Sequence, residues 1–285
     1  HLDLVVSSSF PNAPVAATGE LPLVIYSHGW SGTRELHATK AELLASNGYV
    51  VVAADHTYGA LATHLPDGTL AQLDHEALPN DVPYEEYEAA AEQLVATYAA
   101  DIGSLLEAIL EEGHLDGFLG DDRLIEDAVG IVGHSTGGGA TLQVCERDER
   151  CAAAVTYDPW VEPVPDEIIG GDLAVPLLSI RSEEWAGSPN DDRLRRLHAG
   201  SSAPQGLVLV DGVNHRDLTL LPLFSPLSSL LGLSGSHAGI ERLRSVDEWT
   251  LRFFDHHLRD RGLDPFYSPP VSEGLVLENA LTDPG

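Results

Sequence analysis

The chain has 285 residues, long enough to bury a large core, and its 45 acidic against 15 basic residues give a formal net charge of −30 at pH 7. So acidic a surface excludes nucleic-acid binding and argues against contact with anionic membranes. No internal repeat, low-complexity tract or long linker divides the sequence, so we expect one domain over residues 1–285. Of the possible oligomeric states, a monomer is favoured.

The acidity has two interpretations, and the sequence favours neither. It can reflect a compositional bias, or it can be an adaptation to high salt, in which the repulsion between carboxylates is screened. The chain contains no methionine and begins at His1, so we expect a processed or trimmed chain with no visible signal peptide.

Strands and helices are predicted to alternate along the chain. In order, the apolar patterns predict an edge strand at Leu2–Val6, strands at Leu23–Ser27 and Tyr49–Ala53, and helices near Leu36–Asn47 and at Tyr87–Glu111. A last helix, at 246–261, carries three aromatic residues at helical spacing. This alternation predicts an α/β fold with a mostly parallel, twisted sheet and helices on both faces.

Two segments depart from this plain scaffold. Thr63–Leu70, within an insertion near 60–80, is typical of a hairpin on an Asp-Gly turn, and we expect it to decorate rather than cover the presumed site. The apolar, proline-interrupted segment near 218–236 is too short to span a bilayer, so we expect it to line an acyl pocket or to pack in the core.

The most informative motif is Gly133-His134-Ser135-Thr136-Gly137, which follows the apolar run Ala128–Val132 and precedes a stretch of small residues. A Gly-x-Ser-x-Gly turn between a strand and a helix is the nucleophile elbow, which exposes the serine hydroxyl at the edge of a sheet. Ser135 is therefore the candidate nucleophile. The backbone N–H of Thr136 is a candidate oxyanion donor, and His134 is expected to pack beneath the turn.

A second oxyanion donor is expected from the loop after the strand at Leu23–Ser27. That loop, His28-Gly29-Trp30-Ser31-Gly32, is bracketed by glycines and can turn a backbone N–H toward the nucleophile. His28 itself is interpreted as structural, with its ring hydrogen-bonded inside its own loop.

The partners of Ser135 are expected downstream, in the chain order serine, acid, histidine. His215 follows the strand Leu207–Val210 and is the candidate general base. Two positions compete for the acid: Asp158, after the strand Ala152–Tyr157, and the pair Glu183 and Glu184, after the strand Leu177–Arg181. Spacing alone does not choose between them.

Cys145 and Cys151 are the only cysteines and flank a charged turn, which favours a disulfide over two separate core residues. A disulfide would indicate an oxidising compartment, so secretion is expected, with the cytoplasm as the alternative. Of the 13 histidines, none shows the spacing of a metal site. The neighbours His256 and His257 lie on different faces of their helix, so no metal is predicted, and no cofactor is expected.

Four stretches together resemble the platelet-activating factor acetylhydrolase family of α/β hydrolases: Tyr26–Trp30, Gly133–Gly138, Tyr157–Trp160 and Val213–His215. The resemblance runs from about Leu21 to Arg261. It implies that Asp158 is the triad acid and that the second oxyanion donor is the N–H of Trp30. Vertebrate members carry Phe where this chain has Thr136, so their lipid preference does not transfer.

These features predict a serine carboxylester hydrolase with the catalytic residues Ser135, His215 and Asp158. The alternatives are an acetylhydrolase of short-chain phospholipids, a polyester hydrolase and, in a different class, an inactive binding protein on the same fold. Trp160, Trp185 and Leu218 are the candidate pocket residues. The sequence does not identify the ester.

Overall fold

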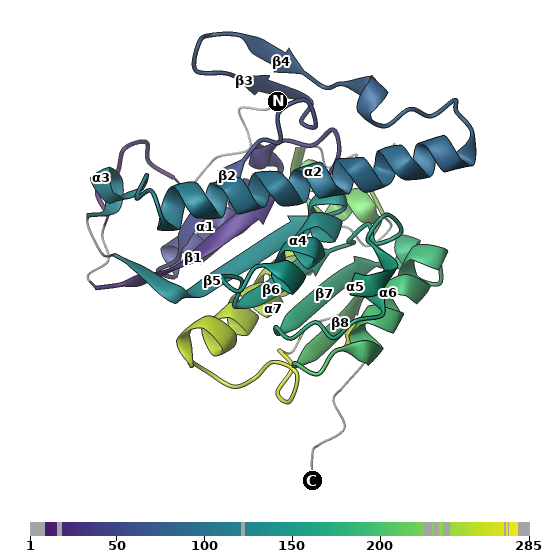
Figure 1. Ribbon diagram of the computed structural model, residues 1–285. Coiled ribbons are helices and arrows are strands. Elements are labelled where there is room, and N and C mark those ends of the chain that lie inside the picture. The colour runs from purple at the N-terminus through teal and green to yellow at the C-terminus, as the bar shows by residue number, and fades with distance from the viewer. Residues whose placement is uncertain are drawn as a thin grey trace.

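The computed structural model has a central sheet with helices on both faces (Figure 1). It describes residues 9–15, 19–120, 123–224, 230, 234–235, 240–270, 272 and 274–278. The strand expected at Leu2–Val6 lies outside the described residues. The described residues form two sheets, one of seven strands and one of two.

Seven strands make up the main sheet, in the order β2-β1-β5-β6-β7-β8-β9. Six of them are parallel and β9 pairs antiparallel with β8. Their bounds are β1 Leu21–Ser27, β2 Val50–Ala54, β5 Leu124–His134, β6 Ala153–Tyr157, β7 Leu177–Ser182, β8 Gln205–Val210 and β9 Leu275–Leu277. Because parallel strands end at one edge, the residues after β1, β5, β6, β7 and β8 meet there, where open α/β sheets place their ligands.

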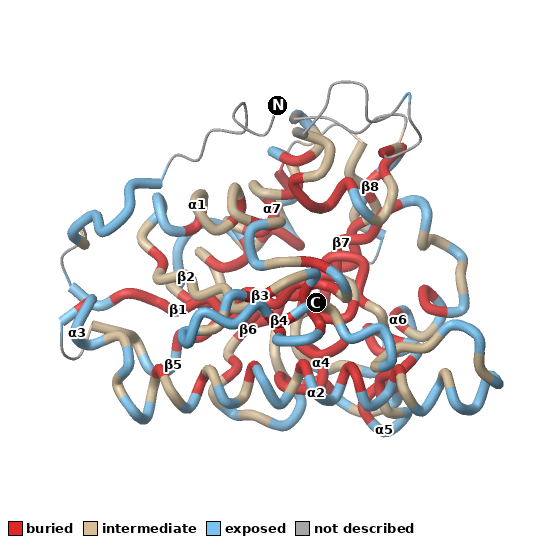
Figure 2. The backbone as a smooth tube through the Cα atoms, turned by 90° about the horizontal axis from the view of Figure 1, so that it is seen from above, coloured by how far each residue is buried: buried red, intermediate tan, exposed pale blue. Residues whose placement is uncertain are grey.

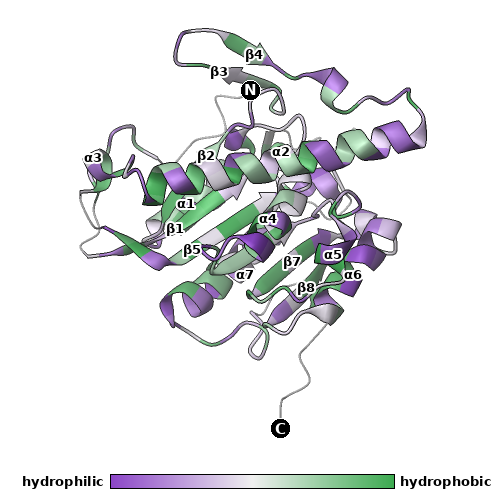
Figure 3. Ribbon diagram, viewed as in Figure 1, coloured by the Kyte–Doolittle hydropathy of each residue, from purple (hydrophilic) through white to green (hydrophobic). Residues whose placement is uncertain are grey.

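Both faces of the sheet are buried, and the strand sequences explain why. In β1, Leu23 and Ile25 belong to one core cluster while Val24 and Tyr26 belong to the other, as the two-residue period of a strand requires. Apolar residues on both faces give the nearly continuous apolar strands of a parallel sheet. Burial is concentrated in β1, β6, β7, β8 and the second half of β5, whereas β2 and β9 at the edges are mostly half-buried (Figure 2). The inner strands are also among the most hydrophobic parts of the fold (Figure 3).

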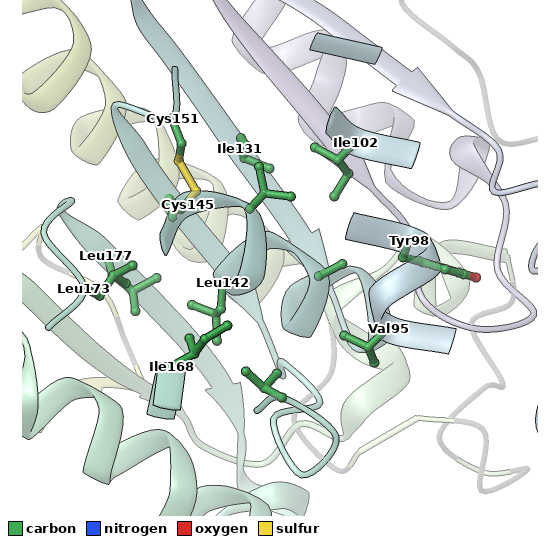
Figure 4. Packing of buried hydrophobic residues seen from close by; sticks show 14 of the residues in the cluster. Val95, Tyr98, Ile102, Ile131, Leu142, Cys145, Cys151, Ile168, Leu173 and Leu177 are labelled. Carbon is green, nitrogen blue, oxygen red and sulfur yellow. A yellow bond between two sulfur atoms is a disulfide. The ribbon is translucent and has the colours of Figure 1, made fainter. Parts of the chain in front are cut away.

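The helices divide between the two faces. Helices α1 (Ala38–Ser46) and α7 (Ile240–Arg259) cover one face, whereas α2 (Tyr84–Leu110), α4 (Thr136–Arg147), α5 (Asp166–Ile169) and α6 (Pro189–Gly200) cover the other. The short helix α3 (Asp116–Leu119) precedes β5. Side chains of α2, α4 and α5 interdigitate with β5 and β7 in the core of the second face (Figure 4).

Helix α2 is the one described helix that is long and apolar enough to cross a membrane by length and composition. A core helix passes the same test, and α2 packs on α4 with seven buried residues: Ala91, Leu94, Val95, Tyr98, Ile102, Leu106 and Ile109. Its contacts are those of a core helix.

The predicted disulfide is confirmed: Cys145 and Cys151 are bonded, six positions apart in the sequence (Figure 4). The bridge joins the last turn of α4 to the segment that enters β6. It therefore ties together the far ends of the helix that begins after Ser135 and the strand that leads to Asp158.

The predicted hairpin is also present, as β3 (Ala62–His64) paired antiparallel with β4 (Leu70–Gln72). It forms a separate small sheet that projects beyond α2 at the top of Figure 1. Its base is bonded to the Trp30 loop, because the Ser31 N–H donates to the Gly59 carbonyl and the Leu61 N–H donates to the Gly32 carbonyl, each at 2.9 Å.

Candidate active site

The turn around Ser135 has the strained geometry of a nucleophile elbow. Ser135 has φ +55° and ψ −118°, a conformation that a non-glycine residue adopts only when its surroundings enforce it. A Cβ on Gly133 would lie 2.2 Å from the Gly137 carbonyl oxygen, and one on Gly137 would lie 2.5 Å from the Ser27 carbonyl oxygen. Both flanking positions therefore require glycine, and Ser135 is left half-buried at the end of β5.

Asp158 and His215 are brought together at the same edge of the sheet. The Asp158 carboxylate is fully buried, and its Oδ2 lies 3.1 Å from His215 Nδ1. Ser182 donates its backbone N–H to Oδ1 at 2.7 Å and its hydroxyl to Oδ2 at 2.6 Å. With these donors the carboxylate is held as an acceptor, so it orients the imidazole with Nδ1 protonated and Nε2 free to take a proton.

Glu183 and Glu184, the competing carboxylates, hold the backbone of the His215 loop instead. Glu183 Oε2 accepts the Gly212 N–H at 3.0 Å, and Glu184 Oε2 accepts the His215 N–H at 2.8 Å. Both residues lie in a single 3₁₀ turn, Glu183–Trp185, directly after β7.

Trp185, the third residue of that turn, stacks on the His215 ring at a centroid distance of 4.4 Å and an interplanar angle of 6°. His134 also stacks on His215, at 4.5 Å and 25°. Because Trp185 and His134 both lie this close to His215 and nearly parallel to it, they cannot both occupy the same face of its ring. The His215 imidazole therefore lies between the other two rings. We call Glu183, Glu184 and Trp185 the histidine clamp.

His134 lies beneath the turn, as predicted. Its Nε2 lies 3.2 Å from the His215 carbonyl oxygen, and its side chain is buried. Burial, and then the nearby His215, lower the pKa of His134 well below 6.5. His134 is therefore neutral at pH 7 and adds no charge beneath the site.

The Trp30 loop lies against the elbow and is fixed by a chain of hydrogen bonds. The His56 N–H donates to His28 Nε2 at 3.0 Å, which leaves the proton on Nδ1, and Nδ1 bonds the Gly29 carbonyl oxygen at 2.8 Å. Burial, and then the nearby His56, lower the pKa of His28 to about 4, so this neutral tautomer persists at pH 7. His28 is hydrogen-bonded inside its loop, as predicted.

Holding the Gly29 carbonyl also orients the N–H of Trp30, which belongs to the same planar peptide. That N–H donates to Thr136 Oγ1 at 3.3 Å. The N–H of Thr136, at the first position of α4, has no helical acceptor. The two expected oxyanion donors thus lie beside each other at the positive end of α4.

A cavity of about 290 Å³ adjoins these groups, and both Ser135 and His215 line it. The other lining residues are Gly29, Trp30, Ser31, Gly32, Leu36, His134, Arg216, Thr219 and Leu221. No residue of the β3–β4 hairpin is among them, in keeping with decoration. Two larger hollows, of about 610 and 600 Å³, lie along α2 and α4 and include neither Ser135 nor His215.

The three expected pocket residues are not among those that line this cavity. Trp185 stacks on His215, Leu218 is buried in the core beside α7, and Trp160 packs toward Tyr87 at a ring distance of 6.4 Å. Pocket residues come instead from the loop after β1 and from the two 3₁₀ turns after β8, His215–Leu218 and Leu221–Phe224. Most of the apolar segment beyond Phe224 lies outside the described residues.

His256 and His257 lie closer to a common point than their helix positions suggested. With Asp264, which returns after α7, they bring one potential ligand atom each to within 4.8 Å of one another. A tetrahedral zinc site needs ligand atoms about 3.4 Å apart, given metal–nitrogen bonds of about 2.0–2.1 Å. The absence of a metal stays a prediction, and among the described residues this group could hold an ion.

Comparison with known proteins is consistent with the geometry. The family model "Platelet-activating factor acetylhydrolase, isoform II" matches residues 4–264. The dog (Canis lupus familiaris) platelet-activating factor acetylhydrolase is 24% identical over 204 residues, which are 66% of this chain and 46% of that protein. Cutinase est1 of Thermobifida alba is 25% identical over 173 residues, 58% of this chain and 47% of the cutinase.

Among solved structures, a ferulic acid esterase from Streptomyces cinnamoneus superposes with a TM-score of 0.76 at 23% identity, covering 92% of this chain and 75% of the esterase. A likeness at this identity establishes the α/β-hydrolase fold. The chain spans about half the length of the dog and Thermobifida relatives.

Proposed function

Because the chain belongs to the platelet-activating factor acetylhydrolase family, isoform II, we propose that it is a serine carboxylester hydrolase that works through an acyl-enzyme. The observation that supports this most is the pairing of the buried Asp158 carboxylate with His215 Nδ1, at the edge where the strained Ser135 lies. The proposal treats the chain as one α/β-hydrolase domain.

In the proposed reaction, Ser135 Oγ attacks the ester carbonyl carbon while His215 Nε2 takes the hydroxyl proton. Asp158 keeps the Nδ1 proton of His215 in place and stabilises the imidazolium that forms. The N–H of Thr136 binds the oxyanion together with the N–H of Trp30, which exchanges its bond to Thr136 Oγ1 for the oxyanion; removing either donor would cost about 3 kcal/mol. His215 then protonates the leaving alcohol, and water attacks the acyl-enzyme by the same groups in reverse.

The size of the cavity favours esters with a short acyl group. At about 290 Å³ it lies at the lower end of the range of small-molecule sites, about 300–1,000 Å³. Short-chain phospholipids and polyesters, which would leave most of their length outside, remain secondary candidates, in line with the acetylhydrolase and cutinase relatives.

We further propose an oxidising compartment, and therefore export, because the Cys145–Cys151 bridge would not persist in a reducing cytosol.

The decisive experiment is turnover of p-nitrophenyl esters across acyl chain lengths, by the wild type and by Ser135→Ala, with and without a serine-directed phosphonate. We expect the highest rates for short acyl chains, loss of several orders of magnitude in Ser135→Ala, and stoichiometric labelling of the wild type alone. A folded wild type that hydrolyses no ester and takes no label would refute the function and favour a binding protein.

A further inference from the structure

The chemistry of the catalytic cavity differs from that of the rest of the molecule. The chain carries 45 acidic residues, yet none is among the described residues that line the cavity. Of these described lining residues, Arg216, directly after His215, is the only one with a permanent charge. As far as its described lining goes, the cavity thus has one cation and no carboxylate, in a protein of net charge −30.

Arg216 makes no ion pair with any carboxylate of the described residues, although nine other basic residues do, including Arg34, Arg181 and Lys40. The carboxylate next to it in the chain, Asp217, is engaged elsewhere. Asp217 Oδ2 accepts the N–H groups of Asn214 and Gly235, at 2.8 and 2.6 Å.

The backbone that carries Arg216 is held in place. Asn214 Oδ1 accepts the N–H groups of Arg216 and Asp217, at 3.1 and 3.2 Å, and this completes a capping box on the 3₁₀ turn His215–Leu218. The Arg216 side chain is exposed, and the residue before it is His215, whose N–H donates to Glu184. The backbone of Arg216 is thus fixed next to His215, so its guanidinium lies beside the reacting groups.

We propose that Arg216 selects esters that carry a carboxylate a few bonds from the scissile carbonyl, such as half-esters of short dicarboxylic acids. This inference rests on the proposed ester hydrolysis and adds the class of substrate. The planar guanidinium matches a carboxylate with two parallel hydrogen bonds.

Charge argues for a carboxylate rather than a phosphate monoester. One guanidinium balances the single negative charge of a carboxylate, whereas a phosphate monoester carries about −1.5 to −2 at pH 7. The excess charge would remain unbalanced inside a protein of net charge −30. The small cavity also suits a short, singly charged ester better than a bulky headgroup.

The test compares kcat/KM for two ethyl esters. One is the monoethyl ester of glutaric acid, and the other is the same ester with its free carboxylate replaced by a carboxamide, which makes it a neutral substrate of the same shape. All measurements use one NaCl concentration, because screening alters the attraction between charges. We expect the wild type to prefer the half-ester and Arg216→Gln to lower the preference about tenfold, the usual size of a lost charge-assisted hydrogen bond. Arg252→Gln, on the exposed face of α7, removes the same charge and should keep the wild-type preference.

An unchanged preference in a folded Arg216→Gln would overturn the assignment. So would a wild type that turns over the ethyl ester of phosphonobutanoic acid faster than the half-ester, since that would indicate a phosphate-like substrate. If no ester in the set is hydrolysed, or if Ser135→Ala hydrolyses them as fast as the wild type, the proposed function itself fails rather than the role of Arg216.

Discussion

Replacing Asp158 by Asn tests the proposed site most directly, because it removes a charge while keeping the shape of the side chain. The carboxylate accepts three hydrogen bonds: Oδ1 from the Ser182 N–H, and Oδ2 from the Ser182 hydroxyl and His215 Nδ1. The Ser182 N–H can only donate, so the amide oxygen of Asn must take the Oδ1 position. The amide NH₂ group then takes the place of Oδ2.

That exchange reverses the bond to His215. The Ser182 hydroxyl can rotate and accept, but His215 Nδ1 faces an N–H and must accept as well, which moves the ring proton to Nε2. Nε2 then has no lone pair to take the proton of Ser135. We expect kcat to fall by about 10⁴, equivalent to about 5 kcal/mol of transition-state stabilisation, with the fold retained because every buried polar atom keeps a partner.

The assay is ester hydrolysis with the folded state checked by thermal melting. Glu183→Gln and Glu184→Gln are matched controls, since their amide oxygens can still accept the N–H groups of Gly212 and His215 and should cost only a few-fold. A folded Asp158→Asn within tenfold of the wild type, or a larger loss in either control, would show that another carboxylate orients His215.

Trp185→Leu removes the stack on His215 and should lower kcat/KM about fivefold, because the indole ring stabilises the His215 imidazolium by about 1 kcal/mol through a cation–π contact. Trp185→Phe keeps an aromatic ring and should keep most of the activity. Equal losses in the two variants would contradict the role of the ring. Thiol titration of the unfolded, unreduced chain should find no free thiol, and two titratable thiols would show that the bridge is absent in solution. Replacing both cysteines by Ala should lower the free energy of unfolding, measured in urea titrations, by about 2 kcal/mol. Burial lowers the pKa of His198 from 6.5 to about 3. The unfolded chain therefore binds the proton first, and the stability present above pH 6.5 is lost as the pH falls, by about 1 kcal/mol for this group at about pH 5.5. His198→Gln should show a shallower pH dependence of unfolding, and an unchanged slope would contradict this role of His198. Raising NaCl from about 0.01 M to about 1 M shortens the Debye length from about 30 Å to about 3 Å and should raise the melting temperature by several degrees, and a flat or falling curve would mean that the carboxylates are already compensated.

The features that the sequence predicts well are those fixed by neighbours in the chain. The elbow at Ser135 depends on glycines two residues away on each side, and the core strands depend on continuous apolar runs, so both are visible locally. Helix α6 was not predicted from the apolar pattern, although its start carries a local signal, Ser188 as the N-cap followed by Pro189.

What spacing alone leaves open depends on the order of the strands. β6, β7 and β8 lie side by side, so both Asp158 and the histidine clamp come within reach of the His215 loop, and no local pattern says which carboxylate meets the imidazole. Where Trp160, Trp185 and Leu218 lie relative to the cavity depends on the strand order in the same way. Trp185 follows β7 and packs against the His215 ring instead of lining the cavity. Leu36 and Arg216 line the cavity, although they come from segments far apart in the chain.

The histidine clamp bears on how a site of this kind can evolve. The end of β7 is occupied by three side chains that hold His215, since Glu183 and Glu184 accept backbone N–H groups of its loop and Trp185 stacks on its ring. Moving the proposed role of Asp158 to Glu183 or Glu184 by one substitution would therefore release the N–H group of Gly212 or His215 that the carboxylate now accepts. Ser135 and Asp158, in contrast, follow the paired strands β5 and β6 of one strand–helix–strand unit, so their spacing is set within a single continuous piece of the fold.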